Sequence, residues 1–213
     1  MAMDTSQTYV IGDIHGMLSR LNRLLDRIPF RPEKDSLAFL GDYIDRGPDS
    51  KGVVDLILDL RARGVQIVTL RGNHEIMFMD YIRGRDPSLF LANGGGSTLV
   101  SYEREHRGNI VIPDQHLAFI DNLLPFYEMD DFILVHAGLR PRVALEKQRE
   151  EDIYWIRGDF IFSDYDFGKR VIFGHTHFQA PYVDDFKIGI DTGAVYGNLL
   201  SCVRLPDIEF YSV

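Results

Sequence analysis

Five short polar clusters in this chain carry residue types that bind metal ions, and each cluster directly follows a short apolar run. The candidate residues are Asp13, His15, Asp42, Asn73, His74, His136 and His175. A lone histidine is more often an ordinary hydrogen-bonded residue than a ligand, but five clusters in the same position relative to an apolar run are not independent accidents. Mixed carboxylate, amide and imidazole donors without thiolates suit Mn, Fe, Zn or Ni rather than a structural zinc site.

The spacing of these residues favours two metal ions. Asp13 and His15 are separated by one residue, so a single turning loop can direct both at one cation. The carboxylate of Asp42 can bridge two cations through its two oxygens. The second cation would be completed by Asn73, His136 and His175. Two ions about 3.5–4 Å apart can acidify a water between them and bind phosphoryl oxygens, so the predicted chemistry is hydrolysis at phosphorus.

The loop formed by residues 41–47 is the centre of the predicted site. It follows an apolar run over residues 36–40, and its sequence is Gly-Asp-Tyr-Ile-Asp-Arg-Gly. Its two glycines and the following proline force the chain into a loop. Two carboxylates, Asp42 and Asp45, and the guanidinium of Arg46 lie within it. Charged loop side chains just past a strand are poor core material and indicate a functional site.

The first third of the chain predicts alternating strands and helices. The strand-like apolar runs cover residues 8–11, 36–40 and 65–70. Helical patterns separate them, with Ser50 expected to cap the second helix. This β-α-β-α-β order predicts a parallel sheet with helices on its faces. In such sheets ligands gather at the carboxyl ends of the strands, where the polar clusters lie.

The remainder of the chain is predicted from the same periodicities. Residues 75–124 are expected to be mostly helical, with a turn or lid hinge at the glycine-rich residues 93–97, which lack the Gly-Lys-Ser/Thr ending of a nucleotide P-loop. Two later strands deliver His136 and His175, and the tail over residues 187–213 is expected to form a second, more antiparallel sheet. No repeat or linker divides the chain, so we expect one domain over residues 1–213.

The composition is that of an ordinary soluble globular protein. The net charge of −9 leaves no basic surplus for binding nucleic acid or an anionic membrane. Cys202 is the only cysteine; it can form neither an internal disulfide nor a thiolate zinc cluster, and its apolar flanks predict a core position. The first residues lack a signal-peptide pattern and no apolar segment reaches transmembrane length, so we expect a cytoplasmic location.

Five motifs, taken in order, resemble those of the phosphoprotein phosphatase family of calcineurin-like metallophosphoesterases. They are Gly-Asp-Ile-His-Gly at residues 12–16, Gly-Asp-Tyr-Ile-Asp-Arg-Gly at 41–47, Arg-Gly-Asn-His-Glu at 71–75, His-Ala-Gly at 136–138 and Gly-His-Thr at 174–176. Trp-Ile-Arg at 155–157 and Asp-Thr-Gly-Ala-Val-Tyr-Gly at 191–197 also resemble the compact bacterial and phage branch of serine/threonine protein phosphatases. The resemblance spans nearly the whole chain. It implies an α/β fold with a central β-sandwich flanked by helices, for which periodicity alone supports only the parallel first half.

The resemblance also implies a role for each matching residue. The metal ligands would be Asp13 and His15 for the first ion, Asp42 as the bridge, and Asn73, His136 and His175 for the second ion. His74 would be the general acid that protonates the leaving oxygen, and Asp45 would orient it. Arg46 and Arg157 would bind phosphate oxygens. A metal-bound hydroxide would attack phosphorus in line, with Mn as the expected metal and Fe, Zn or Ni as alternatives.

The expected activity is metal-dependent hydrolysis of phosphoserine and phosphothreonine, and of phosphotyrosine as an extension. The alternative within the same family is hydrolysis of diadenosine tetraphosphate or a related dinucleotide. Asp45 favours the protein phosphatase, because bacterial dinucleotide hydrolases tend to carry a different residue at that position. The complete ligand set with His74 and Asp45 disfavours a catalytically inactive phospho-binding module. The net charge of −9 disfavours a nucleic-acid phosphodiesterase.

Several residues near the motifs have more than one interpretation. Arg71 could contact phosphate or shape its loop through a salt bridge, and Tyr196 could line the site or be buried. His177 could be an additional ligand of the first metal, whereas Glu75 is expected to cap or pair at a helix start. Two further histidines in polar helical surroundings are expected at the surface: His106 and His116. No motif specifies the native substrate, the metals or the oligomeric state.

Overall fold

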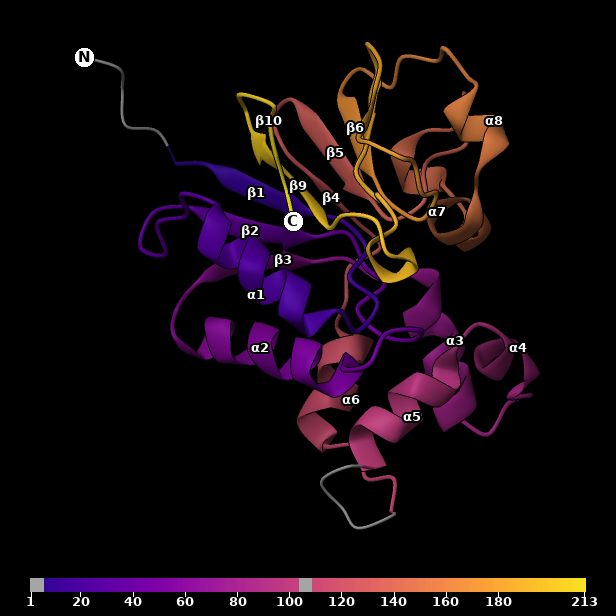
Figure 1. Ribbon diagram of the computed structural model, residues 1–213. Coiled ribbons are helices and arrows are strands. Elements are labelled where there is room, and N and C mark those ends of the chain that lie inside the picture. The colour runs from indigo at the N-terminus through magenta and orange to yellow at the C-terminus, as the bar shows by residue number, and fades with distance from the viewer. Residues whose placement is uncertain (1–5, 104–108) are drawn as a thin grey trace.

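The computed structural model describes residues 6–103 and 109–213. The fold is α/β: two five-stranded mixed sheets pack against each other, and helices cover their outer faces (Figure 1). Apolar side chains fill the space between the sheets, with Val10, Ala38 and Val203 from the first and Leu134, Ile172 and Ile188 from the second. The predicted β-sandwich flanked by helices is therefore confirmed.

The first sheet contains the predicted parallel strands. Its strand order is β10-β9-β1-β2-β3. The bounds are β1 Thr8–Ile11, β2 Ser36–Phe39, β3 Gln66–Thr69, β9 Ser201–Leu205 and β10 Glu209–Ser212. Strand β1 is parallel to β2, and β2 to β3. Side chains alternate between the faces, so that Tyr9 and Ile11 face the helices while Val10 faces the other sheet.

The predicted separate sheet in the tail is wrong, although its antiparallel pairing is right. Strands β9 and β10 extend the first sheet, with β9 antiparallel to β1 in the register Val10↔Val203. Strand β8 (Lys187–Gly189) instead joins the second sheet, parallel to β6 (Arg170–Phe173). A central strand such as β1 needs a hydrogen-bonding neighbour at each edge, and β9 supplies one from about 190 residues later in the chain. Periodicity within the tail carries no information about such a distant partner.

The second sheet has the strand order β4-β5-β6-β8-β7. The bounds are β4 Phe126–Glu128, β5 Phe132–Val135, β6 Arg170–Phe173, β7 Tyr182–Val183 and β8 Lys187–Gly189. Strands β5, β6 and β8 are parallel to one another, and β4 and β7 pair antiparallel at the edges. The carboxyl ends of β5 and β6 thus deliver the loops that carry His136 and His175.

The helices bury the outer faces of both sheets. Those of the first half are α1 Leu18–Arg27, α2 Ser50–Ala62, α3 Asn73–Ile82, α4 Ser88–Ala92, α5 Gly95–Glu103 and α6 Asp114–Asp121. Those of the second half are α7 Glu150–Trp155 and α8 Gly158–Ile161, with 3₁₀ turns η1 Leu145–Lys147 and η2 Ala194–Tyr196. Leu21, Leu24 and Val53 pack on the first sheet, while Ile153 and Phe160 pack on the second. Within the described residues, no helix is long and apolar enough to cross a membrane.

Two local predictions need correction. The N-cap of α2 is Asp49, whose side chain accepts a hydrogen bond from Gly52 N at 3.0 Å, whereas Ser50 is the first helical residue.

His116 is fully buried rather than exposed. Its Nδ1 lies 2.9 Å from Tyr102 Oη, and its Nε2 lies 3.0 Å from the carboxylate of Asp55. The polar residues that flank His116 in the sequence therefore led to the wrong prediction of a surface position. His106 lies outside the described residues, while Cys202 is buried as predicted.

Candidate active site

Five loops that follow strands β1, β2, β3, β5 and β6 meet at one edge of the sandwich. The predicted ligands on them are all buried: Asp13, His15, Asp42, Asn73, His136 and His175. The first and last of these loops are joined directly, because both carboxylate oxygens of Asp13 lie within 3.2 Å of His175 N. Residues far apart in the sequence are thereby fixed around a common centre.

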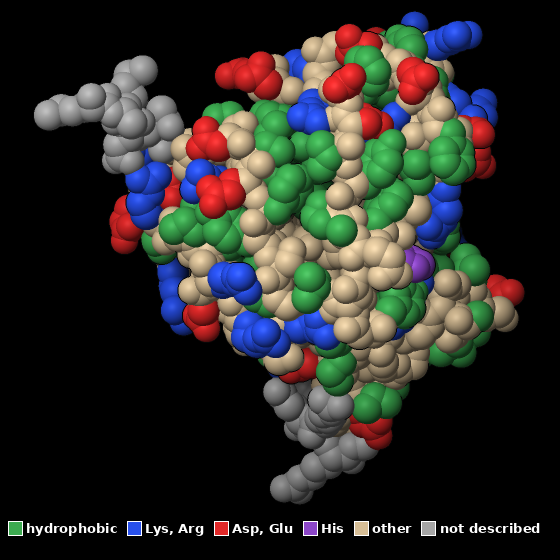
Figure 2. All heavy atoms as spheres, turned by 45° about the horizontal axis from the view of Figure 1, so that its top comes forward, with side chains coloured by type: hydrophobic (Ala, Val, Ile, Leu, Met, Phe, Trp, Pro, Cys, Tyr) green, Lys and Arg blue, Asp and Glu red, His purple; other side chains and the backbone are tan. Residues whose placement is uncertain are grey.

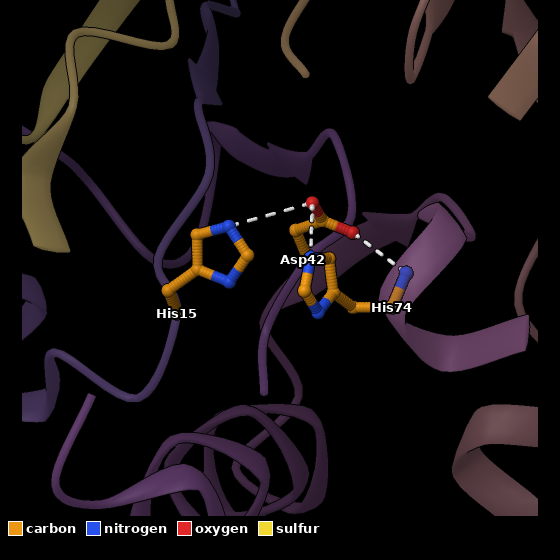
Figure 3. A group of neighbouring side chains, drawn as sticks. All are labelled: His15, Asp42 and His74. Carbon is orange, nitrogen blue, oxygen red and sulfur yellow. Dashed lines mark hydrogen bonds and ion pairs between the residues drawn. The ribbon is translucent and has the colours of Figure 1, made fainter. Parts of the chain in front are cut away.

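The carboxylate of Asp42 lies between the rings of His15 and His74, as Figure 3 shows. Its Oδ2 atom is 3.5 Å from His15 Nε2 and 4.0 Å from His74 Nε2, while its Oδ1 accepts a hydrogen bond from His74 N at 3.1 Å. His15 donates its Nδ1–H to the carbonyl of Ile44 at 2.8 Å. The Nε2 lone pair of His15 is therefore directed into the site.

A second group of donor atoms shares Asp42. Its Oδ1 lies 3.5 Å from His136 Nε2, and Asn73 Oδ1 lies 3.0 Å from His136 Nε2 and 2.9 Å from His175 Nδ1. His136 donates its Nδ1–H to the carbonyl of Leu40 at 2.8 Å. A neutral imidazole has one N–H, so His136 Nε2 faces the two oxygens as an acceptor among acceptors. Such a convergence of lone pairs fits a cation.

The donor atoms therefore fit two metal ions that share one carboxylate. Potential ligand atoms lie within 4.8 Å of one another in two groups: His15, Asp42 and His74, and Asp42, His136 and His175. Burial lowers the pKa of His15 to about 3 and the pKa of His136 below its ordinary value, which keeps both imidazoles neutral and able to ligate. Burial and the neighbouring carboxylates of Asp191 and Asp42 raise the pKa of Asp13, so bound cations would relieve this repulsion.

His74 differs from the other histidines of the site. Its Nδ1 lies 2.6 Å from Asp45 Oδ2, and its Nε2 is buried without a hydrogen-bond partner. Burial lowers the pKa of His74, but Asp42 and Asp45 outweigh that effect and the net pKa is raised. With Nδ1–H donated to Asp45, protonation of Nε2 gives an imidazolium that could deliver a proton into the site.

Asp45 is itself held by two hydroxyl groups that the sequence did not reveal. Its Oδ1 accepts a hydrogen bond from Thr98 Oγ1 at 2.6 Å, and its backbone N–H lies within 3.1 Å of both Thr98 Oγ1 and Ser50 Oγ. The two hydroxyls lie 3.0 Å apart, and both residues are fully buried.

The predicted phosphate-binding arginines line a cavity of about 370 Å³ above the ligands. Arg46 donates to His15 Nε2 at 2.7 Å, and its backbone N–H is bound by the carbonyl of Gly94 at 3.1 Å. Arg157 donates to the carbonyl of His175 and to Thr176 Oγ1. The cavity is also lined by His177 and Tyr196, whose roles the sequence left open, and by residues to which no role was assigned from the sequence: Asn93, Trp155 and Asp191.

The structure distinguishes between several open interpretations. Arg71 does not line the cavity; it donates to the carbonyls of Ile120 and Asp121 and so shapes its loop through the backbone rather than a salt bridge. Glu75 accepts backbone N–H bonds from Gly72, Asp42 and Tyr43, which joins the second and third loops. Tyr196 is 60% exposed and lines the cavity. The alternative in which it is buried is wrong.

Basic and acidic side chains are interspersed on the face shown in Figure 2. Within the cavity, positive charge is supplied by Arg46 and Arg157.

Comparisons with known proteins agree with this geometry. The family model for calcineurin-like phosphoesterases matches residues 7–179. Two curated relatives, each an asymmetrical bis(5′-nucleosyl)-tetraphosphatase PrpE, are 26% identical to the chain and come from Bacillus thuringiensis (strain Al Hakam) and Bacillus cereus (strain 03BB102). Both alignments cover 96% of this chain and 92% of the relative.

Solved structures share the fold at lower identity. The crystal structure of a candidate diadenosine tetraphosphatase superposes with a TM-score of 0.78 at 24% identity, covering 100% of this chain and 95% of that one. A protein serine/threonine phosphatase from Saccharomyces cerevisiae superposes with a TM-score of 0.66 at 14% identity, covering 99% and 80%. Both the dinucleotide and the phosphoprotein branches thus use this architecture.

Proposed function

The chain belongs to the calcineurin-like phosphoesterase family of metal-dependent hydrolases, and we propose that it cleaves bis(5′-nucleosyl) tetraphosphates asymmetrically, into a nucleoside triphosphate and a nucleoside monophosphate. The observation that carries this proposal is the alignment to relatives of that named activity over 96% of this chain and 92% of theirs. It outweighs the expectation of a phosphoprotein substrate, which rested on the resemblance of the motifs to the phosphoprotein phosphatase family and, against the dinucleotide alternative, on Asp45. The dinucleotide substrate is therefore the first choice.

The metal centre would be held by the predicted ligands. Asp13 and His15 would bind one ion, Asn73, His136 and His175 the other, and Asp42 would bridge. When bound, two divalent ions supply an acidified water and positive charge for the phosphoryl oxygens. Mn²⁺ is our first choice of metal, since the carboxylate, amide and imidazole donors suit it.

The remaining residues would bind and protonate the substrate. Arg46 and Arg157 present planar guanidinium groups to the cavity, and such groups bind phosphate oxygens in a bidentate manner. His74 would donate a proton from Nε2 to the leaving oxygen, while Asp45 holds its Nδ1–H at 2.6 Å and stabilises the imidazolium.

The second candidate function is hydrolysis of phosphoserine or phosphothreonine, and the pairing of His74 with Asp45 favours it. The alkoxide that leaves a phosphoserine is a strong base and needs a proton in the transition state. A nucleotide that leaves a tetraphosphate chain is a much weaker base and needs little help. A buried general acid whose Nδ1 lies 2.6 Å from a supporting carboxylate oxygen is thus more useful to a phosphomonoesterase than to a dinucleotide hydrolase.

Product analysis tests the proposal. The purified protein is incubated with diadenosine tetraphosphate and Mn²⁺, with a phosphoserine peptide in parallel, and the nucleotides are separated by anion-exchange chromatography. We expect ATP and AMP in equal amounts, at a higher kcat/KM than for the peptide, and no products after chelation of the metal. Two molecules of ADP would exclude asymmetrical cleavage. Rapid peptide turnover without dinucleotide cleavage would establish the second candidate instead.

A further inference from the structure

Two aromatic side chains in the cavity have no role in the chemistry proposed above. Tyr196 is 60% exposed and Trp155 is 38% exposed, and both line the cavity together with Arg46 and Arg157. The Tyr196 ring lies beside one of the proposed phosphate-binding arginines, with its centroid 5.6 Å from the guanidinium carbon of Arg46. Trp155 lines the same cavity as the other, Arg157.

The backbone around Tyr196 holds this ring in an exposed position. Tyr196 ends the turn η2, which lies between two glycines with positive φ, 72° at Gly193 and 93° at Gly197. Asp191 Oδ1 accepts a hydrogen bond from Gly193 N at 2.9 Å, and Tyr196 N donates to the carbonyl of Gly193 at 3.0 Å. The loop is thus constrained, and its one large apolar side chain is presented to the cavity instead of the core.

Trp155 is also held in an exposed position by the backbone, in this case at the end of helix α7. It is the last residue of α7, and its neighbours Tyr154 and Ile156 are both buried, so the helix directs Trp155 outward. Its ring lies edge-on to the predicted ligand His175, with centroids 6.3 Å apart and an interplanar angle of 83°. An indole edge against His175 leaves indole surface available to the cavity.

We propose that Trp155 and Tyr196 form an aromatic subsite that binds a nucleobase of the substrate by stacking. Exposed rings next to arginines are how proteins bind the bases of a phosphate-linked chain, because every base has a π face and the arginines bind the phosphates. The inference rests on the proposed dinucleotide substrate and adds what would recognise its organic part.

The subsite can be tested by binding, without turnover. AMP and ribose 5-phosphate differ only by the base, and their affinities for the Mn²⁺-loaded protein are measured by titration calorimetry. Loss of one base–aromatic stack by truncation costs about 5- to 150-fold in affinity. We therefore expect AMP to bind at least about fivefold more tightly than ribose 5-phosphate. Equal affinities would overturn the proposal.

Intrinsic fluorescence gives a second readout, because Trp155 is the only tryptophan of the chain. AMP is expected to quench this fluorescence at saturation, whereas ribose 5-phosphate is not. O-phosphotyrosine is the comparison for a different aromatic phosphate. If it quenches and binds as well as AMP, the subsite accepts any aryl group and the assignment to a nucleobase is wrong.

Variants assign the effect to the rings. Tyr196→Leu should remove most of the advantage of AMP over ribose 5-phosphate, and Tyr196→Phe should retain it. The control is Tyr127→Leu, because Tyr127 is also exposed but lies on β4 outside the cavity; it should leave the advantage unchanged. If Tyr196→Leu weakens both ligands by the same factor, the ring does not recognise the base. Failure of the protein to cleave diadenosine tetraphosphate would refute the proposed function, whereas the AMP advantage is measured independently.

Discussion

The substitution His74→Asn removes the candidate general acid and leaves its surroundings nearly intact. Asp45 Oδ2 now lies 2.6 Å from His74 Nδ1, and the asparagine amide can still donate an N–H toward this oxygen. Asp45 Oδ1 keeps its hydrogen bond from Thr98. The backbone N–H of residue 74 still reaches Asp42 Oδ1. We therefore expect a folded variant in which the bridging carboxylate stays in place.

The expected loss of activity depends on the basicity of the leaving group. General acid catalysis contributes about 10²–10⁴-fold, which corresponds to about 2.7–5.4 kcal/mol of barrier at about 1.36 kcal/mol per tenfold. Phosphoserine releases a strongly basic alkoxide, so its kcat should fall by about 10²–10⁴. Diadenosine tetraphosphate releases a weakly basic nucleotide, so its kcat should fall by less than about tenfold.

Steady-state kinetics on both substrates, with the bound metal measured by mass spectrometry, gives the result. An equal fall for both leaving groups would refute the acid role of His74. Loss of bound metal together with activity would make His74 a ligand, a role that its proximity to donor atoms of His15 and Asp42 permits. The matched control is His116→Asn, a buried histidine outside the cavity; it should leave the ratio of the two rates unchanged.

Three further predictions concern the supports of the site and of the fold. Thr98→Val removes the hydroxyl bound to the carboxylate of Asp45 and should cost about 1.5–3 kcal/mol in the free energy of unfolding, whereas Thr98→Ser should cost less; equal denaturation midpoints for both would contradict this. Chelation should abolish activity, and Mn²⁺ should restore it to the wild type but not to Asp42→Asn, as followed with 4-nitrophenyl phosphate. Hydrogen bonds from Arg31 lower the pKa of Asp35 in the folded protein. The contribution of the Asp35 carboxylate to the free energy of unfolding is therefore complete above the unfolded-state pKa of about 3.9, and it is lost as the pH falls through the lower folded-state pKa. The excess unfolding free energy of wild type over Asp35→Asn should therefore shrink below about pH 4, and a pH-independent difference would exclude this linkage.

Local patterns predicted those parts of the fold whose partners are close in sequence. Strands β1 to β3 pair with neighbours that follow one helix later, so the alternation of periodicities was enough to predict a parallel sheet. The predicted ligands converge because their loops follow strand ends on one edge. Strand β9 could not be placed in this way, since its partner β1 lies about 190 residues earlier in the chain. Pairing at that range depends on which edge remains uncovered, and a tail sequence does not encode that.

The supports of the site were less predictable than its charged residues. Thr98 and Ser50 act through hydroxyls on helices α5 and α2, where small polar residues usually signify nothing more than a cap or a solvated face. Ser50 was predicted to be an N-cap, because a serine at the start of a helix commonly has that role, whereas its hydroxyl instead binds the backbone of Asp45. Only the approach of the 41–47 loop to both helices gives these hydroxyls their function.

Backbone conformation adds a further constraint that residue types conceal. Among the described residues, the non-glycine residues with positive φ include five in the site: His15, Asp42, Asp45, Arg46 and His175, at 47°, 52°, 72°, 66° and 61°. Left-handed conformations of this kind cost about 1–3 kcal/mol each where a side chain is present. Glycine would relieve the strain but would remove a candidate ligand, the carboxylate of Asp45 or the guanidinium of Arg46, so the proposed function and the local preference conflict at all five positions.

The strain is offset by hydrogen bonds that one motif donates to another. The backbone N–H of each strained residue is bound by a group from a different segment: Asp42 O for His15, Glu75 Oε2 for Asp42, Thr98 Oγ1 for Asp45, Gly94 O for Arg46 and the Asp13 carboxylate for His175. Each of these conformations is therefore stabilised by a hydrogen bond from another segment of the chain. This gives a structural reason for residues with no proposed catalytic role, because Glu75 supports the loop of Asp42 and Gly94 supports that of Arg46.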